Sequence, residues 1–332
     1  MNSPISKRFV KVESRMLNQA LFTVYRHPGQ GAIIFCRLDR FRLYTFALSN
    51  MKTQPELEKI ASQIRRDIIR QTWSAKSGHP GGSLGCADMM TSLFFNHLRF
   101  TLPFKMEGKD EDVFVLSNGH ISPLFYSVLA RSGFFPVNEL ATFRMINSRL
   151  QGHPATHEHL PGVRVATGSL GQGLSVALGM ALAKRFSGDE HLVYCLTGDG
   201  ELQEGQNWEA IMAAAHYKAD RLIAIVDWNG QQIDGPNDKI ISLGDLEAKW
   251  LSFGWKVLHA NGNSMKEIDE TLTLAGAMTG KGMPIVILMK TIMGFGVDFM
   301  MGTNKWHGVA PNDEQARLAL EQLAETLGDY QI

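Results

Sequence analysis

Short apolar runs alternate with amphipathic stretches from residue 53 onward. Thr53, a proline and Glu56 mark a helix start, and Leu57, Ile60, Ile64 and Ile68 then recur on one helical face. Further helices are expected near Pro123 and at Leu174–Phe186, Trp208–Tyr217 and Asp313–Leu327. Four continuous apolar runs predict buried strands: Asp112–Ser117, His191–Thr197, Arg221–Asp227 and Pro284–Lys290. Strands that alternate with helices in this way predict one α/β domain, a parallel sheet with helices on both faces, over residues 51–332.

The first fifty residues follow a different pattern. They contain eight basic and two acidic residues, and their apolar residues show no sustained period. Three interpretations remain open: translation from an over-early start, a cleaved arginine-rich targeting segment, or a genuine extension. We favour the first, with Met51 as the true initiator, and assign no function to residues 1–50.

Composition excludes several classes of protein. The 332 residues include 33 basic and 33 acidic ones, and this balance argues against nucleic acid or an anionic membrane as a partner. No apolar run approaches the roughly 18 residues that a membrane span needs. The three cysteines, Cys36, Cys86 and Cys195, lack metal-site or redox-motif spacing and are expected to be reduced thiols. We therefore expect a soluble, cytoplasmic protein.

Polar, glycine-rich segments follow the predicted strands, where an open parallel sheet binds its ligands. They are Ser117–His120, Thr197–Gly205, Asp227–Gln231 and Thr291–Gly296. Asp199 and Asn229 are thirty positions apart, each after a strand. A carboxylate, an amide oxygen and a nearby carbonyl suit Mg²⁺ or Ca²⁺ when a diphosphate completes the shell. Gly198 and Gly200 would let the backbone approach that diphosphate.

A glycine-rich loop and four histidines are the other candidates. Thr167–Gly173 precedes a predicted helix and is either an anion-binding loop or a close-packing turn. Each of the four histidines has a glycine beside it: His79, His120, His153 and His307. Neutral imidazoles suit proton transfer and hydroxyl recognition, and the spacing of these four does not fit a metal cage. The triplet His157–His159 is interpreted as a solvated loop.

The ordered motifs resemble the N-terminal, diphosphate-binding domain of transketolase, a thiamine diphosphate enzyme, from about Met51 to His307. The matching segments are Ser77–Gly81, Leu116–His120, Gly152–Pro154, Thr167–Gly173, Gly198–Gly200, Gln203–Gly205, Asn229, Ile233–Gly235, Gly294–Gly296 and His307–Gly308. Trp228 departs from the family, whose members often have an acidic or amide residue there, and we interpret it as a local packing change.

The resemblance implies a role for individual residues. Asp199, Asn229 and the Gln231 carbonyl would hold Mg²⁺ or Ca²⁺. Thiamine diphosphate would contact His120, Gly168, Gly200, Asn229 and His307, with the Leu170 backbone near its aminopyrimidine. The histidines His79, His153 and His307 would face the sugar and move its protons. Glu204 would meet a carboxylate of a partner subunit.

The resemblance also implies a partner. Whole transketolases are about twice as long, and the part beyond this match carries the glutamate that activates the cofactor. The chain would therefore be the N-terminal subunit of a split transketolase, and it would form an α2β2 assembly with a separately encoded C-terminal subunit. It would transfer a two-carbon ketol unit between sugar phosphates. Three alternatives stay open: an unusual sugar acceptor, the α subunit of a 2-oxo acid dehydrogenase, and a non-catalytic binding protein.

Overall fold

The computed structural model describes residues 10–17, 20–27, 30–36 and 51–332, and the chain divides into two compact units, residues 1–52 and 53–332. In the first unit, the strands β1 (Val10–Leu17), β2 (Ala20–His27) and β3 (Gln30–Cys36) form an antiparallel sheet in that order. The sequence pattern did not predict these strands. The proposed start at Met51 and the interpretation of residues 1–50 as a leader fall partly outside the described residues and stay predictions.

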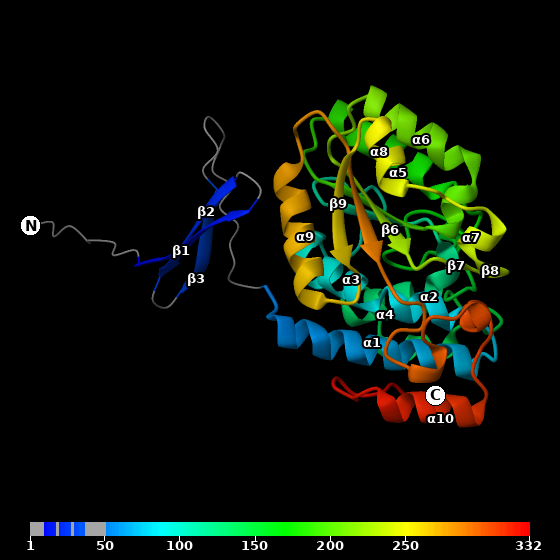
Figure 1. Cartoon of the computed structure of the whole chain (residues 1–332). Helices are drawn as coiled ribbons and strands as arrows, with labels where there is room; N and C mark the ends of the chain where they lie inside the picture. The colour runs from blue at the N-terminus through cyan, green and yellow to red at the C-terminus, as the bar shows by residue number, and fades with distance from the viewer. Residues whose placement is uncertain (1–9, 18–19, 28–29, 37–50) are drawn as a thin grey trace, which may run out of the picture. The chain divides into compact units, whose positions relative to one another are not determined.

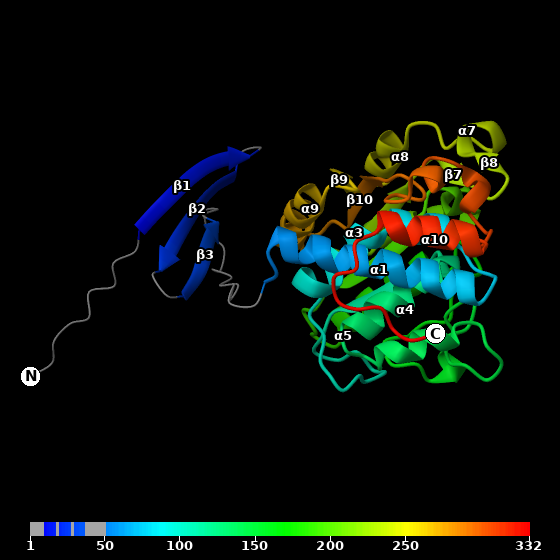
Figure 2. The same cartoon turned by 90° about the horizontal axis from the view of Figure 1, so that it is seen from below.

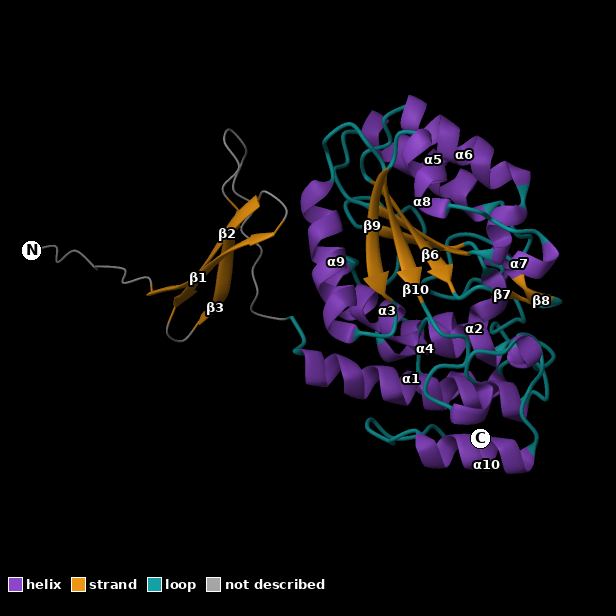
Figure 3. Ribbon diagram, in the orientation of Figure 1, coloured by secondary structure: helices purple, strands orange, loops and turns teal. Residues whose placement is uncertain are grey.

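The second unit is built on a five-stranded parallel sheet, as the sequence predicted. Its strand order is β4–β5–β6–β10–β9, and the bounds are β4 (Val113–Leu116), β5 (Val193–Gly198), β6 (Leu222–Trp228), β9 (Lys256–Asn261) and β10 (Ile285–Lys290). Edge strand β9 was missed, because Lys256 and His259 interrupt its apolar run. The four predicted strands are parallel neighbours in the sheet, so their carboxyl ends lie on one side of it. Figure 3 shows this common direction for β6, β10 and β9.

Helices cover both faces of this sheet because side chains alternate along each strand. On one face Ile223 and Ile225 share a core cluster with residues of α1 (Gln54–Ser74), α2 (Pro80–Gly85), α3 (Ala87–Ser92), α4 (Ser122–Arg131), α9 (Met265–Met278) and α10 (Asp313–Gln322). On the other face Leu222, Ala224 and Val226 pack against α5 (Gly173–Phe186), α6 (Gly205–His216) and α8 (Leu246–Ser252) (Figure 1). A two-stranded hairpin, β7 (Gln231–Gln232) and β8 (Gly235–Pro236), precedes the short helix α7 (Asn237–Ile240).

Two helices show how local chemistry sets their ends. Helix α1 begins after Thr53, whose backbone N–H donates to the Glu56 carboxylate at 2.7 Å. Helix α10 ends at Gln322, five residues before the predicted end, because Arg66 donates to the carbonyl oxygens of Leu320 and Leu323. Those bonds tie the end of α10 to α1, which runs beside it (Figure 2). No helix in the described part of the chain is long and apolar enough to cross a membrane.

Candidate functional site

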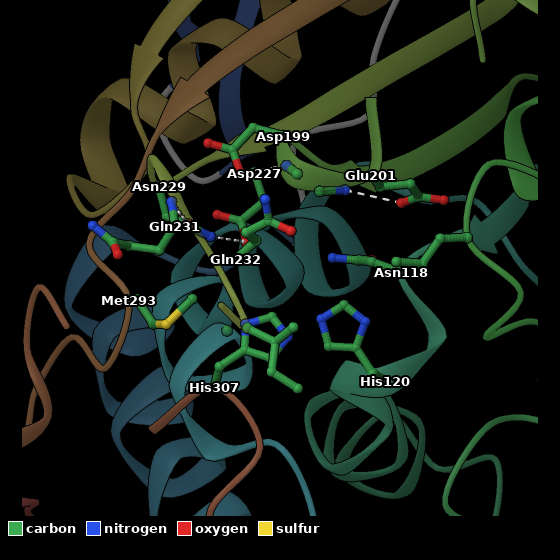
Figure 4. A pocket seen from close by; sticks show the side chains of 15 residues that line it. Asn118, His120, Asp199, Glu201, Asp227, Asn229, Gln231, Gln232, Met293 and His307 are labelled. Atoms are coloured by element: carbon green, nitrogen blue, oxygen red, sulfur yellow. Dashed lines mark hydrogen bonds between the residues drawn. The ribbon is translucent and has the colours of Figure 1, made fainter. Parts of the chain in front are cut away.

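A pocket lies at the carboxyl edge of the sheet, where the ends of β4, β5, β6 and β10 meet (Figure 4). Its lining residues come from these four strand ends, helix α2 and two nearby loops: Gly82, Asn118, His120, Leu170, Gly198, Asp199, Gly200, Glu201, Asp227, Asn229, Gln231, Gln232, Ile233, Met293 and His307. The parallel topology therefore brings segments far apart in sequence to one place.

One wall of the pocket is acidic. Asp199 is buried and accepts hydrogen bonds from the N–H groups of Gly200 at 2.8 Å and Gly230 at 2.6 Å. Burial, followed by repulsion from the Asp227 carboxylate, raises the pKa of Asp199 to about 7, although those two N–H groups oppose the rise. A bound cation would offset both costs.

The amide of Asn229 is fixed beside this carboxylate pair. Its Nδ2 donates to Asp227 at 2.9 Å, and its Oδ1 accepts from the Gln231 N–H at 2.8 Å. These bonds assign the amide orientation, and they place a neutral oxygen in the same pocket as Asp199. The described residues contain no group of three or more His, Cys, Asp or Glu side chains able to hold a metal. The Asp199–Asn229 pair thus fits a cation only together with a ligand that brings its own oxygens.

The opposite wall of the pocket contains His120 and His307 (Figure 4), and the rings of His79 and His153 lie close to this pair without lining the pocket. Ring centroids of His79 lie 5.1 Å from His120, 5.7 Å from His307 and 6.3 Å from His153, and those of His120 and His307 are 5.0 Å apart. Burial is the main cause that lowers the pKa of all four rings, to about 4 for His79. The four imidazoles are therefore neutral near pH 7 and able to donate and accept protons.

Two of these rings have an unused nitrogen. His79 Nδ1 and His307 Nδ1 are buried without a hydrogen-bond partner among the described residues, and so is Asn118 Oδ1. Buried polar atoms are normally satisfied. Polar groups of a ligand would fit this wall of the pocket. The exposed His157, in contrast, contacts Glu158 at 3.1 Å and does not line the pocket, as expected for a solvated loop.

The glycine-rich loop Thr167–Gly173 packs closely against the rest of the pocket. A Cβ on Gly168 would lie 2.5 Å from the His153 ring, and one on Gly119 would lie 2.7 Å from the Gly168 nitrogen. The N–H groups of Gly171 and Gly173 donate to Glu201 and Ser117, so they are not free for an anion. This half of the loop is a close-packing turn, whereas Leu170 remains partly exposed at the pocket.

The remaining predicted residues lie around the pocket in different ways. Gly200 and Gln231 both line it directly, and Gln231 also pairs with Pro236 of β8. The Glu204 side chain is exposed and is not a lining residue. Trp228 packs against the core on the α5–α6 side, and the Lys290 ammonium lies 4.5 Å from its ring centroid.

Sequence reasoning assigned no role to several residues at the site. Asp227 and Asn118 belonged to strand-end segments that were singled out, but their buried contacts depend on neighbouring strands. Glu201 lies in the strand-end segment Thr197–Gly205 but was given no role of its own, and only 2% of it is exposed. Met293 and Gln232 carry no chemical signal in sequence. One signal in the sequence was available: the three acidic residues of the pocket all lie at or just after strand ends, namely Asp199, Glu201 and Asp227.

Comparison with known families identifies the family of the second unit. Residues 57–327 match the family model described as transketolase, thiamine diphosphate binding domain. This match covers almost all of the second structural unit and none of the described strands of the first.

Similar proteins fall into two groups by length. One subunit of the apulose-4-phosphate transketolase of Actinobacillus succinogenes is 39% identical over 81% of this chain and 96% of the relative. The 6-deoxy-6-sulfo-D-fructose transketolase subunit SqwG of Clostridium sp. is 36% identical over 81% of this chain and 97% of the relative. The match to transketolase of Staphylococcus epidermidis, at 39% identity, spans only 40% of that protein. The solved transketolase of Leishmania mexicana superposes with a TM-score of 0.76 at 32% identity, over 85% of this chain and 43% of the solved one.

Proposed function

The chain belongs to the family of transketolase thiamine diphosphate-binding domains, and from that premise we propose that it is the diphosphate-binding subunit of a two-subunit transketolase. It spans about two fifths of the transketolases from Staphylococcus epidermidis and Leishmania mexicana, but nearly all of two relatives that are named as subunits. The complementary part of the enzyme would come from a separate C-terminal subunit, in an α2β2 assembly in the cytoplasm.

The proposed reaction moves a two-carbon ketol unit from a ketose phosphate to an aldose phosphate. Bound thiamine diphosphate supplies the nucleophilic carbon and stabilises the negative charge that develops when the donor is cleaved. Asp199, Asn229 and the Gln231 carbonyl would hold Mg²⁺ or Ca²⁺ against the diphosphate. The raised pKa of Asp199 supports this assignment, because the carboxylate is costly without a cation nearby.

The observation that carries the proposal is the cluster of four neutral histidine rings at the pocket, His79, His120, His153 and His307. His120 and His307 would contact the cofactor, together with Gly168, Gly200 and the Leu170 backbone. His79, His153 and His307 would bind the sugar hydroxyls and move their protons. Rings held neutral at pH 7 are suited to this work, since each can accept a proton from one hydroxyl and donate to another.

The partner subunit would cover the open side of the pocket. Leu170 and Ile233 line the pocket and are 37% and 59% exposed. Apolar side chains at the rim of a polar pocket are typical of a protein interface. Glu204, exposed at the start of α6, would meet a carboxylate of that partner.

The identity of the sugars is a second proposal. Relatives of similar length are named for apulose 4-phosphate and for 6-deoxy-6-sulfo-D-fructose. We infer that this chain also serves an enzyme for an uncommon sugar acceptor or donor. The dehydrogenase and non-catalytic alternatives gain no support, because the similar proteins described above are all named transketolases.

The test is to purify the tagged chain with its partner from the native source and assay ketol transfer. Activity that requires both thiamine diphosphate and Mg²⁺, in a preparation that contains a second chain, supports the proposal. The neutral His120 ring is also proposed as a catalytic group, so His120→Ala should then lower turnover by about 10²–10⁴-fold, the usual contribution of a proton-transfer group. The exposed His157→Ala is the matched control. Full turnover in His120→Ala would remove His120 from the mechanism, and a lone inactive chain would contradict the proposed enzyme.

A further inference from the structure

Glu201 is a buried carboxylate at the lining of the pocket that has no role in the proposed chemistry. Only 2% of the residue is exposed, and in the described part of the chain no lysine or arginine forms an ion pair with it. Burial raises its pKa, although its hydrogen bonds oppose the rise. A buried carboxylate without a cation is destabilising unless hydrogen-bond donors surround it.

The donors that surround Glu201 come from three separate segments. Its Oε1 accepts from the Gly171 N–H at 2.8 Å and from the Ser117 hydroxyl, while its Oε2 accepts from the Gly198 N–H at 3.0 Å. Ser117 in turn accepts from the Gly173 N–H at 3.1 Å. One side chain thus joins the end of β4, the end of β5 and the glycine-rich loop. Figure 4 shows Glu201 on the same side of the pocket as Asn118.

These three segments approach one another too closely for other side chains to fill the space between them. A Cβ on Gly173 would lie 2.4 Å from Ser117, and one on Gly171 would lie 2.8 Å from the Glu204 Cβ. The backbone of Glu201 is fixed as well, because its carbonyl accepts from Asn207 Nδ2 at 2.7 Å. Hydrogen bonds therefore hold both the backbone and the carboxylate of Glu201 in place.

We propose that Glu201 is a positioning residue that holds the loop Thr167–Gly173 against the ends of β4 and β5. This inference rests on the proposed function, because the loop carries Gly168 and Leu170, and the β5 end carries Gly198 and Asp199. By fixing the two segments relative to each other, Glu201 sets the width of the pocket before a cofactor enters. Preorganisation of this kind lowers the ordering cost of binding.

Replacing Glu201 by glutamine distinguishes the effect of its hydrogen bonds on the loop from the effect of its packed volume. Glutamine has nearly the same shape, but only one of its two terminal groups is an acceptor. It can accept from Gly171 or from Gly198, and not from both. The loop and the β5 end would then lose one of their common hydrogen bonds, while the packed volume stays the same.

The first experiment is hydrogen–deuterium exchange on the full chain without cofactor. In Glu201→Gln, amides of residues 167–173 should exchange about tenfold faster, the effect of losing a single hydrogen bond of this kind. Peptides from β6 and β10 should be unchanged, and Glu201→Ala should show a larger effect. Glu270→Gln, which changes an exposed carboxylate on α9, is the matched control. Unchanged exchange in the loop, or an equal increase over the whole sheet, would overturn the proposal.

The second experiment measures thiamine diphosphate affinity in the assembled enzyme with Mg²⁺. The dissociation constant should rise about tenfold in Glu201→Gln, as expected for one lost charged hydrogen bond. Unchanged affinity despite faster loop exchange would show that the loop position does not serve the cofactor. If the wild-type assembly binds no thiamine diphosphate, the proposed function fails. The exchange experiment still decides whether Glu201 holds the loop.

Discussion

Gly119 offers a sharp test of how closely the pocket is assembled. A methyl group at this position would lie 2.7 Å from the Gly168 nitrogen and equally close to the carbonyl carbon and hydroxyl of Thr167. Two of these three atoms belong to the backbone, so rotation of a side chain cannot relieve the clash. Restoring ordinary contact requires the two loops to separate by roughly 0.8 Å, given that carbon atoms pack at about 3.5 Å.

Gly119→Ala should therefore move His120 away from the loop that carries Gly168. Overpacking of this size should lower the free energy of unfolding by about 1–3 kcal/mol. Misplacement approaching 1 Å can cost about 10²-fold in rate, so ketol transfer should fall by up to that factor. Urea unfolding of the chain and initial-rate assays of the assembled enzyme measure the two effects.

The matched control is Gly276→Ala in helix α9, where a Cβ would meet nothing within 4 Å. Alanine is favoured over glycine in a helix by about 1 kcal/mol, so this variant should be as stable as wild type or more so. It should keep full activity. If Gly119→Ala had the same free energy of unfolding and the same rate of ketol transfer as Gly276→Ala, the close approach of the two loops would not matter for stability or activity.

Three further predictions follow from the site. Asp199→Asn should raise the dissociation constant for Mg²⁺ by at least ~100-fold, measured by calorimetric titration with thiamine diphosphate present. Even residues that only support metal ligands change metal affinity by about 10–100-fold when they are mutated. Unchanged Mg²⁺ affinity would remove Asp199 from the metal site. The pKa of His79 is lowered from 6.5 to about 4 in the folded chain, so the unfolded chain binds the proton first as the pH falls. The stability that His79 contributes is therefore lost between pH 6.5 and pH 4. In urea unfolding, His79→Gln should flatten this decline of stability, and a pH dependence identical to that of wild type would contradict the reasoning. Glu204→Ala should leave the fold intact, because the side chain is exposed, but weaken assembly with the partner in sedimentation velocity, whereas equal assembly would exclude the proposed contact.

Much of the fold was predictable because the signal was local. The runs that became β4, β5, β6 and β10 are apolar on both faces, as strands buried between two helical layers must be. Strand β9 lies at an edge and is only partly covered, so its sequence carries no such run. The strands of the first unit lack any sustained alternation that would have identified them.

The site was predictable where a residue type and its place after a strand coincided. That rule identified Asp199, Asn229 and His120, and the structure places all three in one pocket. It could not assign Glu201, whose meaning depends on amides of a loop thirty residues away along the chain. The sequence left the loop Thr167–Gly173 open between an anion-binding loop and a close-packing turn, because the bond from the Gly171 N–H to Glu201 is a long-range pairing.

Trp228 has a consequence for how the site can be observed. Its indole lies one residue before Asn229, under the Lys290 ammonium, and is half-buried rather than sealed in the core. Indole emission depends on the charges and the solvent around the ring, and both change when a cation and an anion enter the neighbouring pocket. Trp228 therefore gives this chain a built-in optical signal, by which the order and speed of ligand entry can be followed without a label.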